Sequence, residues 1–313
     1  MRAEGGFALL VVLSAVGILA VVAASFAQMA RTHIRVVAVG TESARAEAFA
    51  DAGVQLAILD IVAARDSTLA NRRFAVDATP FVCSVADGEA TLTIAVQDEA
   101  GKVDLNIASE PLLRALVFGL DVQAGEAAAD AILDFRDADD DRRPSGAERA
   151  EYRAAGRAHG PKNAPFVAVE ELAGVLALTR TEVDRLRPFV TVNSGQAGID
   201  PSAASSALID ILVRGGARAG GLIAGEGPSF AGAEGERGRT GPLPAQFVTA
   251  SSRHVFSVHS QARTARGAIF VREAIVELGA SRTAAFLIRR WHRGTATIGA
   301  RHGVAPRPDL PSC

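Results

Sequence analysis

Residues 7–30 read FALLVVLSAVGILAVVAASFAQMA, a run that contains neither a charged residue nor proline. Arg2 and Glu4 are the only charged residues that precede it, and Arg31 follows it directly. At about 1.5 Å per residue, a helix of this length spans roughly 30 Å, which is the thickness of a membrane hydrocarbon core. The run is also longer than the apolar region of an ordinary signal peptide. The sequence therefore predicts a membrane-spanning helix over residues 7–30.

The pattern after this run predicts that the helix continues. Residues 41–64 are rich in alanine, and their apolar side chains recur every three to four positions, at Ala46, Phe49, Ala52, Leu56, Leu59 and Ala63. Such spacing is typical of an amphipathic helix. We therefore expect one stem helix over residues 7–64, whose first half crosses the membrane and whose second half packs on a sheet.

Strand signals lie on both sides of the middle of the chain. Segments 74–85 and 90–98 form one pair of predicted strands, with Asp87-Gly88 between them. Segments 254–263 and 267–278 form a second pair of predicted strands. An Asp-Gly pair between apolar runs is a strong hairpin signal. A helical block from about residue 106 to 212 separates the two pairs, and residues 284–293 could form a last strand. The predicted class is α+β: a long N-terminal helix, an antiparallel sheet, and a large inserted α-helical domain.

The composition limits the possible functions. The chain has 313 residues and a formal net charge of −2, which gives no electrostatic case for binding nucleic acid. No catalytic constellation and no phosphate-binding motif is present, so we expect no enzymatic activity. The two cysteines are Cys83 and Cys313, the last residue. A disulfide is chemically possible in an oxidising compartment, but we expect none here because terminal residues are usually mobile.

An acidic segment is the one candidate for metal chemistry. Asp137, Asp139, Asp141 and Glu148 occupy positions 1, 3, 5 and 12 of a twelve-residue loop, as carboxylates do around calcium. Position 6 is Arg142 where a calcium loop of this type has glycine, so the segment is not an EF-hand. Asp134 faces the same region and is a weaker ligand candidate. The alternative is a solvated acidic turn that Arg136, Arg142 and Arg143 partly neutralise.

The helical block contains a short internal repeat. Residues 103–116 align with residues 199–212 at an offset of 96, so that Asp104 matches Asp200 and both helices start after a serine, Ser109 or Ser205. Serine is a favourable residue at such a position because it can cap free backbone N–H groups. Similar repeats grip DNA phosphates in helix-hairpin-helix proteins. Here they carry no basic cluster, so we interpret them as structural turns.

The N-terminus resembles the leader of type IV prepilins and pseudopilins, because Gly5-Gly6 directly precedes Phe7 and the apolar helix. The resemblance implies that prepilin peptidase cuts after Gly6 and that Phe7 becomes the methylated first residue. An uncleaved N-terminal anchor is the alternative. Most members of this family have Glu as the fifth mature residue, where this chain has Val11. That Glu pairs with the N-terminal amine of the preceding subunit, so a subunit without it suits the first position, at the filament tip.

Four further stretches resemble the minor pseudopilin K family of type II secretion systems, which usually lacks this Glu. They are GKVDLNIAS (101–109), DFRDADDDRRPSGAERAEY (134–152), GPKNAPFVAVEEL (160–172) and RPFVTVNSGQAGIDPSAA (187–204). The resemblance implies a single-pass protein of the inner membrane with a periplasmic C-terminal domain. It also implies assembly with minor pseudopilins I and J and with the major pseudopilin, a role in starting and capping the pseudopilus for export of folded proteins, and calcium in the helical domain.

This interpretation divides the chain into six parts. Residues 1–6 are the leader, 7–64 the stem helix, 65–105 and 245–293 the sheet domain, 106–214 the helical insertion, 215–244 a Gly-rich loop, and 294–313 a flexible tail. One alternative is a membrane-anchored periplasmic DNA-binding protein with helix-hairpin-helix repeats, for which a basic groove would be needed. Another is an anchored calcium-binding adhesin, which would not explain Gly6-Phe7 or the missing Glu.

Overall fold

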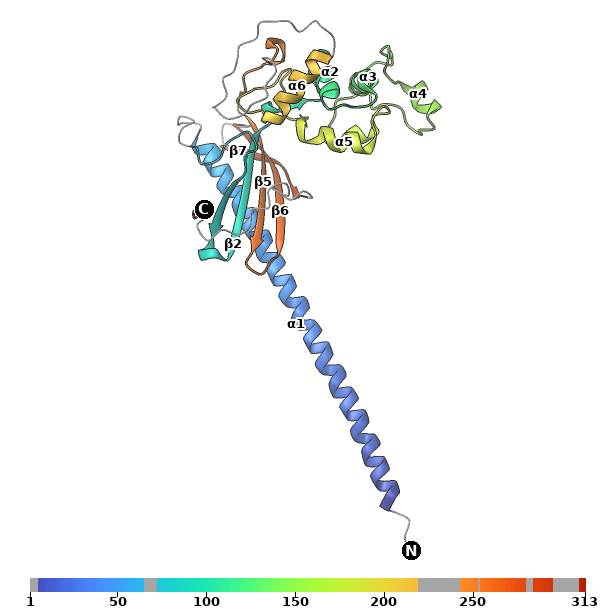
Figure 1. The fold of residues 1–313 in the computed structure, drawn as a ribbon, viewed down its shortest axis with the longest axis vertical. Coiled ribbons are helices and arrows are strands. Elements are labelled where there is room, and N and C mark those ends of the chain that lie inside the picture. The colour runs from blue at the N-terminus through green and yellow to red at the C-terminus, as the bar shows by residue number, and fades with distance from the viewer. Residues whose placement is uncertain (1–4, 65–71, 219–242, 253, 280–283, 295–309) are drawn as a thin grey trace.

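The computed structural model describes residues 5–64, 72–218, 243–252, 254–279, 284–294 and 310–313, with residues 5–8 as backbone only. Figure 1 shows a long N-terminal helix, an antiparallel sheet along its upper part, and further helices beyond the end of the sheet. The predicted α+β class is therefore confirmed. In chain order the helices and strands are α1 (Gly5–Ala63), β1 (Phe81–Val85), β2 (Ala90–Asp98), β3 (Val103–Asp104), α2 (Glu110–Gly119), α3 (Gly125–Arg136), α4 (Arg149–Ala154), α5 (Arg180–Leu186), β4 (Val190–Thr191), α6 (Ser206–Arg218), β5 (Val255–Thr264), β6 (Ile269–Leu278) and β7 (Phe286–Arg293).

Helix α1 is a continuous helix of 59 residues, which corresponds to a length of about 90 Å. Its N-terminal part projects alone from the rest of the molecule (Figure 1). The described part of α1 is long and apolar enough to cross a membrane, and none of its most apolar window is buried. Large apolar side chains from Leu9 to Val39 are exposed along it. This surface can be shielded from water only by lipid or by other protein.

The C-terminal part of α1 packs on the sheet, but through a different face from the predicted one. Of the predicted stripe, Ala46 is buried, whereas Ala52 and Leu59 are exposed. The buried stripe consists largely of small residues, namely Ala46, Ala50, Gly53, Val54, Ala57, Ile58 and Ile61. A Cβ atom on Gly53 would lie 2.2 Å from Ser260 Oγ, so the helix and sheet approach too closely for larger side chains.

The sheet has five strands in the order β1-β2-β5-β6-β7, and every neighbouring pair is antiparallel. The predicted hairpins are confirmed, with Asp87 and Gly88 at positive φ in the first turn. Apolar side chains of the inner face, including Leu92, Ile94 and Phe256, form a core with α1.

A buried arginine of β6 fastens α1 to this sheet. The Arg272 guanidinium donates to Asp51 Oδ1 and to Glu47 Oε1, each at 2.6 Å. It also lies over the rings of Phe270, at 4.9 Å, and Trp291, at 5.2 Å. These contacts hold the charge at the boundary between helix and sheet, where it is shielded from water on two sides.

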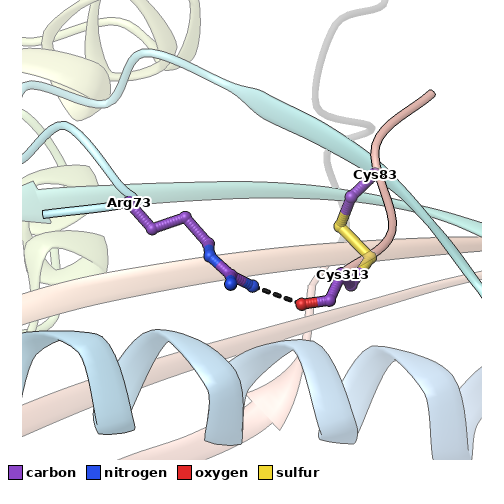
Figure 2. The surroundings of a disulfide bond; sticks show 3 residues. All are labelled: Arg73, Cys83 and Cys313. Carbon is purple, nitrogen blue, oxygen red and sulfur yellow. Dashed lines mark hydrogen bonds between the residues drawn. A yellow bond between two sulfur atoms is a disulfide. The ribbon is translucent and has the colours of Figure 1, made fainter.

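The C-terminus is covalently bound to the sheet, which corrects the expectation of unpaired cysteines. Cys83 in β1 and Cys313 form a disulfide (Figure 2). Ser84 N donates to Pro311 O at 2.8 Å, and Cys313 N donates to Ser84 O at 2.9 Å. Backbone pairing along the outer edge of β1 therefore orders the last residues, which positions Cys313 for oxidation. Residues 295–309 of the predicted tail lie outside the described residues.

The helical insertion leaves the sheet after β2 and returns to it at the neighbouring strand β5. It has its own hydrophobic core, and the short strands β3 and β4 pair in parallel within it. Helices α2 and α6 cross closely at two glycines, because a Cβ on Gly119 or on Gly215 would collide with a carbonyl oxygen of the other helix. The prediction of a loop from residue 215 was therefore wrong for Gly215–Arg218, which end α6. Residues 219–242 lie outside the described residues.

Candidate functional site

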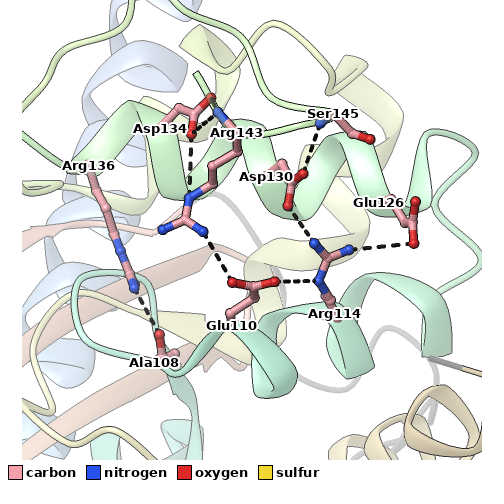
Figure 3. A network of polar contacts seen from close by, with 9 residues as sticks. All are labelled: Ala108, Glu110, Arg114, Glu126, Asp130, Asp134, Arg136, Arg143 and Ser145. Carbon is pink, nitrogen blue, oxygen red and sulfur yellow. Dashed lines mark hydrogen bonds and ion pairs between the residues drawn. The ribbon is translucent and has the colours of Figure 1, made fainter. Parts of the chain in front are cut away.

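The acidic segment forms the connection between α3 and α4, and hydrogen bonds from its backbone to side chains of α3 hold it in place. Asp130 and Asp134 are buried on α3. Asp130 Oδ2 accepts a hydrogen bond from Ser145 N at 3.0 Å, and Asp134 accepts from Arg143 N at 3.3 Å (Figure 3). Gly146 passes directly over Asp134, where a Cβ would lie 2.0 Å from its Oδ2.

Most of the nearby arginines are engaged by other groups. Arg114 donates to Glu110 and Asp130, at 2.9 and 2.7 Å, as Figure 3 shows. Arg136 donates to the backbone carbonyl of Ala108 at 2.9 Å. Arg142 lies 3.6 Å from a carboxylate oxygen of Glu151. Of the three arginines expected to neutralise the acidic segment, Arg143 forms an ion pair with Asp134 of α3, at 3.5 Å.

The predicted calcium ligands lie in two environments. Glu148 is buried, with 4% of its surface exposed, and Asp137 is half-buried. Asp139 and Asp141 are exposed, and Asp141 N donates to Asp139 Oδ1 at 3.0 Å. Asn163 reaches the same turn, because its Nδ2 donates to Asp139 O at 2.7 Å and to Asp140 Oδ1 at 3.1 Å.

The carboxylates that influence the pKa of Glu148 differ slightly from the predicted calcium ligands. Burial, followed by the carboxylates of Asp134, Asp137, Asp140 and Asp139, raises the pKa of Glu148 to about 7. Burial also raises the pKa of Asp137, with Asp139 as the next cause, and raises that of Asp134. The weaker candidate Asp134 thus belongs to this cluster, whereas exposed Asp141 is not among the main causes of the Glu148 pKa shift.

Several buried oxygen atoms of the cluster have no hydrogen-bond donor. They are Asp137 Oδ1, both carboxylate oxygens of Glu148, and Asn163 Oδ1. Buried carboxylate oxygens without donors are costly unless a proton or a cation compensates them. Among the described residues no three His, Cys, Asp or Glu side chains are arranged as a ready metal site. The unsatisfied atoms are nevertheless all oxygens, the donor type that calcium prefers.

Asn163 is the residue of this site that the sequence did not reveal. It lies on another loop, with φ at +48°, and belongs to no acidic pattern. A spacing argument finds ligands within one segment and cannot detect a side chain that the fold brings in from elsewhere.

The internal repeat proves to consist of two similar turns before α2 and α6. Asp104 Oδ1 accepts from Asn106 N at 2.9 Å, and Asp200 Oδ1 accepts from Ser202 N at 2.8 Å. Ser205 caps α6 by accepting from Leu208 N at 3.3 Å, whereas Ser109 makes no such bond. These contacts are internal to the domain and do not favour a phosphate-binding role.

The predicted processing site lies in the first turn of α1. Gly6 and Phe7 follow Gly5, where the described helix begins. Val11, at the expected glutamate position, lies on the same helix with 49% of its surface exposed.

Residues 93–195 match the family model described as type II secretion system (T2SS), protein K. A search of curated proteins gives no match. Among solved structures, a chain of the GspK-GspI-GspJ complex of the type 2 secretion system from enterotoxigenic Escherichia coli has a TM-score of 0.54 at 16% identity. The similarity covers 85% of this chain and 99% of that chain, and at this identity it demonstrates the fold alone.

Proposed function

We propose that this chain, which belongs to the protein K family of the type II secretion system, starts and caps the pseudopilus. In this role it helps export folded proteins across the outer membrane. The observation that carries the proposal is the position of the helical insertion. It lies at the end of the sheet farthest from the exposed half of α1 (Figure 1). In a filament built from packed stems, this bulk would block any further subunit beyond the tip, while the stem below remains free to receive the following subunit.

The N-terminal half of α1 supplies the second argument. Val11 carries no carboxylate, so the chain cannot neutralise the amine of a preceding subunit within the apolar core. It can still present its own amine to a following subunit that has the glutamate. This asymmetry restricts the chain to one end of a filament and makes its role one of assembly rather than catalysis.

We propose minor pseudopilins I and J as its immediate partners, the major pseudopilin as the subunit that follows, and prepilin peptidase as its processing enzyme. The solved complex that this fold resembles contains GspK, GspI and GspJ. The apolar surface from Leu9 to Val39 is the surface that such stems would cover.

Processing gives a direct test of the pseudopilin assignment. We expect cleavage after Gly6 and a methylated Phe7 in protein extracted from membranes. Mass spectrometry of the N-terminal peptide measures both. A chain that starts at Met1, or that is cut beyond residue 30, would contradict the assignment.

Filament length tests the capping role. Overproduction of this subunit should give more and shorter pseudopili, because each filament accepts one tip. The lengths can be measured by electron microscopy, and a labelled subunit should be found at one end. Label distributed along the shaft would contradict the proposal.

The Cys83–Cys313 disulfide supports a periplasmic position for everything beyond the membrane-spanning segment. Disulfides persist in the bacterial periplasm and are rare in the cytosol. We therefore propose a single-pass inner-membrane protein with its C-terminal domain in the periplasm.

We also propose that calcium orders the acidic segment. Asp137 and Glu148 would be the inner ligands because their buried oxygens have no donors. Asp139 and Asp141 are the outer candidates, together with Asn163 from the neighbouring loop. A bound divalent cation would supply the positive charge that offsets the mutual repulsion of these carboxylates.

Thermal melting of the full chain in detergent tests this proposal. Calcium at a hundredfold excess over Kd should stabilise the folded state by about 2.7 kcal/mol relative to a chelator. Magnesium should be a poor substitute because it requires a tight octahedral site and retains its waters. Asp137→Asn should remove most of the gain. Identical melting in calcium and in chelator would identify the segment as a solvated acidic turn.

A further inference from the structure

A cleft of about 510 Å³ lies in the helical insertion. It is formed by the end of α4, the loop that follows, and the 3₁₀ segment Val169–Gly174. Its lining residues are Phe135, Tyr152, Arg157, Ala158, His159, Gly160, Lys162, Glu171 and Gly174. Ligand sites in proteins commonly have volumes of about 300–1,000 Å³. The cleft is therefore large enough for a small ligand or the end of a peptide, and too small for a folded domain.

The aromatic side of the cleft is fixed by the core. Phe135 and Tyr152 are both buried, and Phe135 stacks on Phe166 with ring centroids 4.8 Å apart. The Tyr152 hydroxyl accepts a hydrogen bond from Leu176 N at 3.1 Å. Gly174 packs against the Phe135 ring, where a Cβ would approach to 3.3 Å. An apolar group could thus dock on a preformed aromatic surface.

The rim of the cleft has an excess of positive charge. Lys162 Nζ donates to both oxygens of Glu171, at 3.0 and 2.8 Å, so these two charges neutralise each other. Arg157 and His159 also line the cleft and are exposed. Within the part of the chain that the structure describes, no carboxylate forms an ion pair with either of them. The arginine is therefore available for a bidentate contact with an external carboxylate.

We propose that this cleft binds the free C-terminus of a polypeptide whose last side chain is apolar. The α-carboxylate would pair with Arg157, and the last side chain would pack on Phe135 and Tyr152. A peptide end fits better than a free acid because small residues, Ala158 and Gly174, form the exposed rim. They leave a path for the chain that leads away from the cleft. The proposal does not depend on the tip position of the subunit.

Fluorescence anisotropy with the full chain in detergent tests the proposal. The probe is a fluorescein-labelled hexapeptide that ends in leucine and phenylalanine with a free carboxylate, and the control probe is its C-terminal amide. We expect amidation to weaken binding at least about tenfold, because the charge-assisted hydrogen bonds to the arginine are lost. Equal binding of the acid and the amide would overturn the proposal.

Matched variants locate the binding to this cleft. Arg157→Gln should weaken binding of the acid by the same factor as amidation, whereas Arg153→Gln, an exposed arginine of α4 outside the cleft, should have no effect. Ala158→Trp should block the cleft without changing charge, and Ala154→Trp is its exposed control. An Arg157→Gln variant that binds like Arg153→Gln would refute the assignment.

A competition experiment distinguishes a carboxylate at the end of a peptide from the carboxylate of a small free acid. 3-Phenylpropionate carries the same carboxylate and a similar ring but no peptide chain. We expect it to displace the labelled peptide only at concentrations at least about tenfold higher than the unlabelled peptide requires. Displacement at equal concentration would show that the site takes a small acid, and the peptide assignment would be wrong.

Discussion

Replacement of Glu148 by glutamine should stabilise the calcium-free protein at alkaline pH. The folded state raises the pKa of this buried carboxyl from 4.5 to about 7. A group whose pKa is raised in the folded state stabilises that state while it is protonated. This stability is present in full below the ordinary pKa of 4.5 and is lost as the pH rises through about 7. Stability should therefore fall between about pH 4.5 and pH 7 as the unfolded state gives up its proton first. Glutamine resembles the protonated form at every pH and avoids this loss.

The size of the effect follows from the two pKa values. A pKa of about 7 against 4.5 corresponds to about 3 kcal/mol of differential stability. For a domain of 150–250 residues this amounts to about 6–12 °C in melting temperature. At pH 8 in chelator, Glu148→Gln should melt higher than the natural chain by up to this amount. At pH 5 the difference should shrink to about a quarter of this amount.

Melting curves of the full chain in detergent, recorded in chelator and in calcium at both pH values, measure this prediction. Glu170→Gln is the matched control, because Glu170 is an exposed glutamate of the same domain. Calcium should raise the melting temperature of the natural chain and leave that of Glu148→Gln nearly unchanged. If Glu148→Gln and Glu170→Gln melt alike at pH 8 in chelator, Glu148 is not a strained carboxylate.

Three further substitutions test the fold. Cys313→Ser should lower the free energy of unfolding by about 3–5 kcal/mol, because the bond to Cys83 closes a loop across a sequence separation of 230. Reductant should lower the melting temperature of the natural chain to that of the variant and leave the variant unchanged. Gly53→Val should destabilise by about 1–3 kcal/mol through its clash with β5, whereas Gly40→Ala, in open space, should be neutral or stabilising in urea titrations. Arg272→Met should cost about 2 kcal/mol in the same titrations, since two carboxylates of α1 lose their partner; an unchanged midpoint would show that the ion pairs are not needed.

The sequence predicts those elements of this fold that local periodicity determines. The long apolar run, the alternation around Leu92 and Ile94, and the Asp87-Gly88 turn each specify their own conformation, and the structure has the stem and hairpins there. The buried face of α1 was predicted wrongly because this stretch is rich in alanine, so more than one face shows apolar residues every three to four positions. The helix instead approaches the sheet through alanines and Gly53, and a close approach depends on the partner surface.

The remaining differences have the same cause, which is contact between distant segments. Gly215 reads as a loop residue until α2 is placed beside it, where only glycine fits. Cys313 reads as a free terminal residue until backbone bonds to β1 order the last residues. In the candidate site, spacing predicted Asp137 and Glu148 as ligands, which stays a prediction, and Asn163 comes from a separate loop that the spacing does not include.

Co-purification tests the tip assignment most directly. The full chain would be expressed with minor pseudopilins I and J of the same secretion system, extracted in detergent, and captured through a tag on J. We predict one complex that contains all three chains in equal amounts. A variant of this chain that lacks the helical insertion should still be recovered in that complex, because it keeps the stem. Recovery of I and J together without this chain, under conditions in which it is folded, would contradict the account.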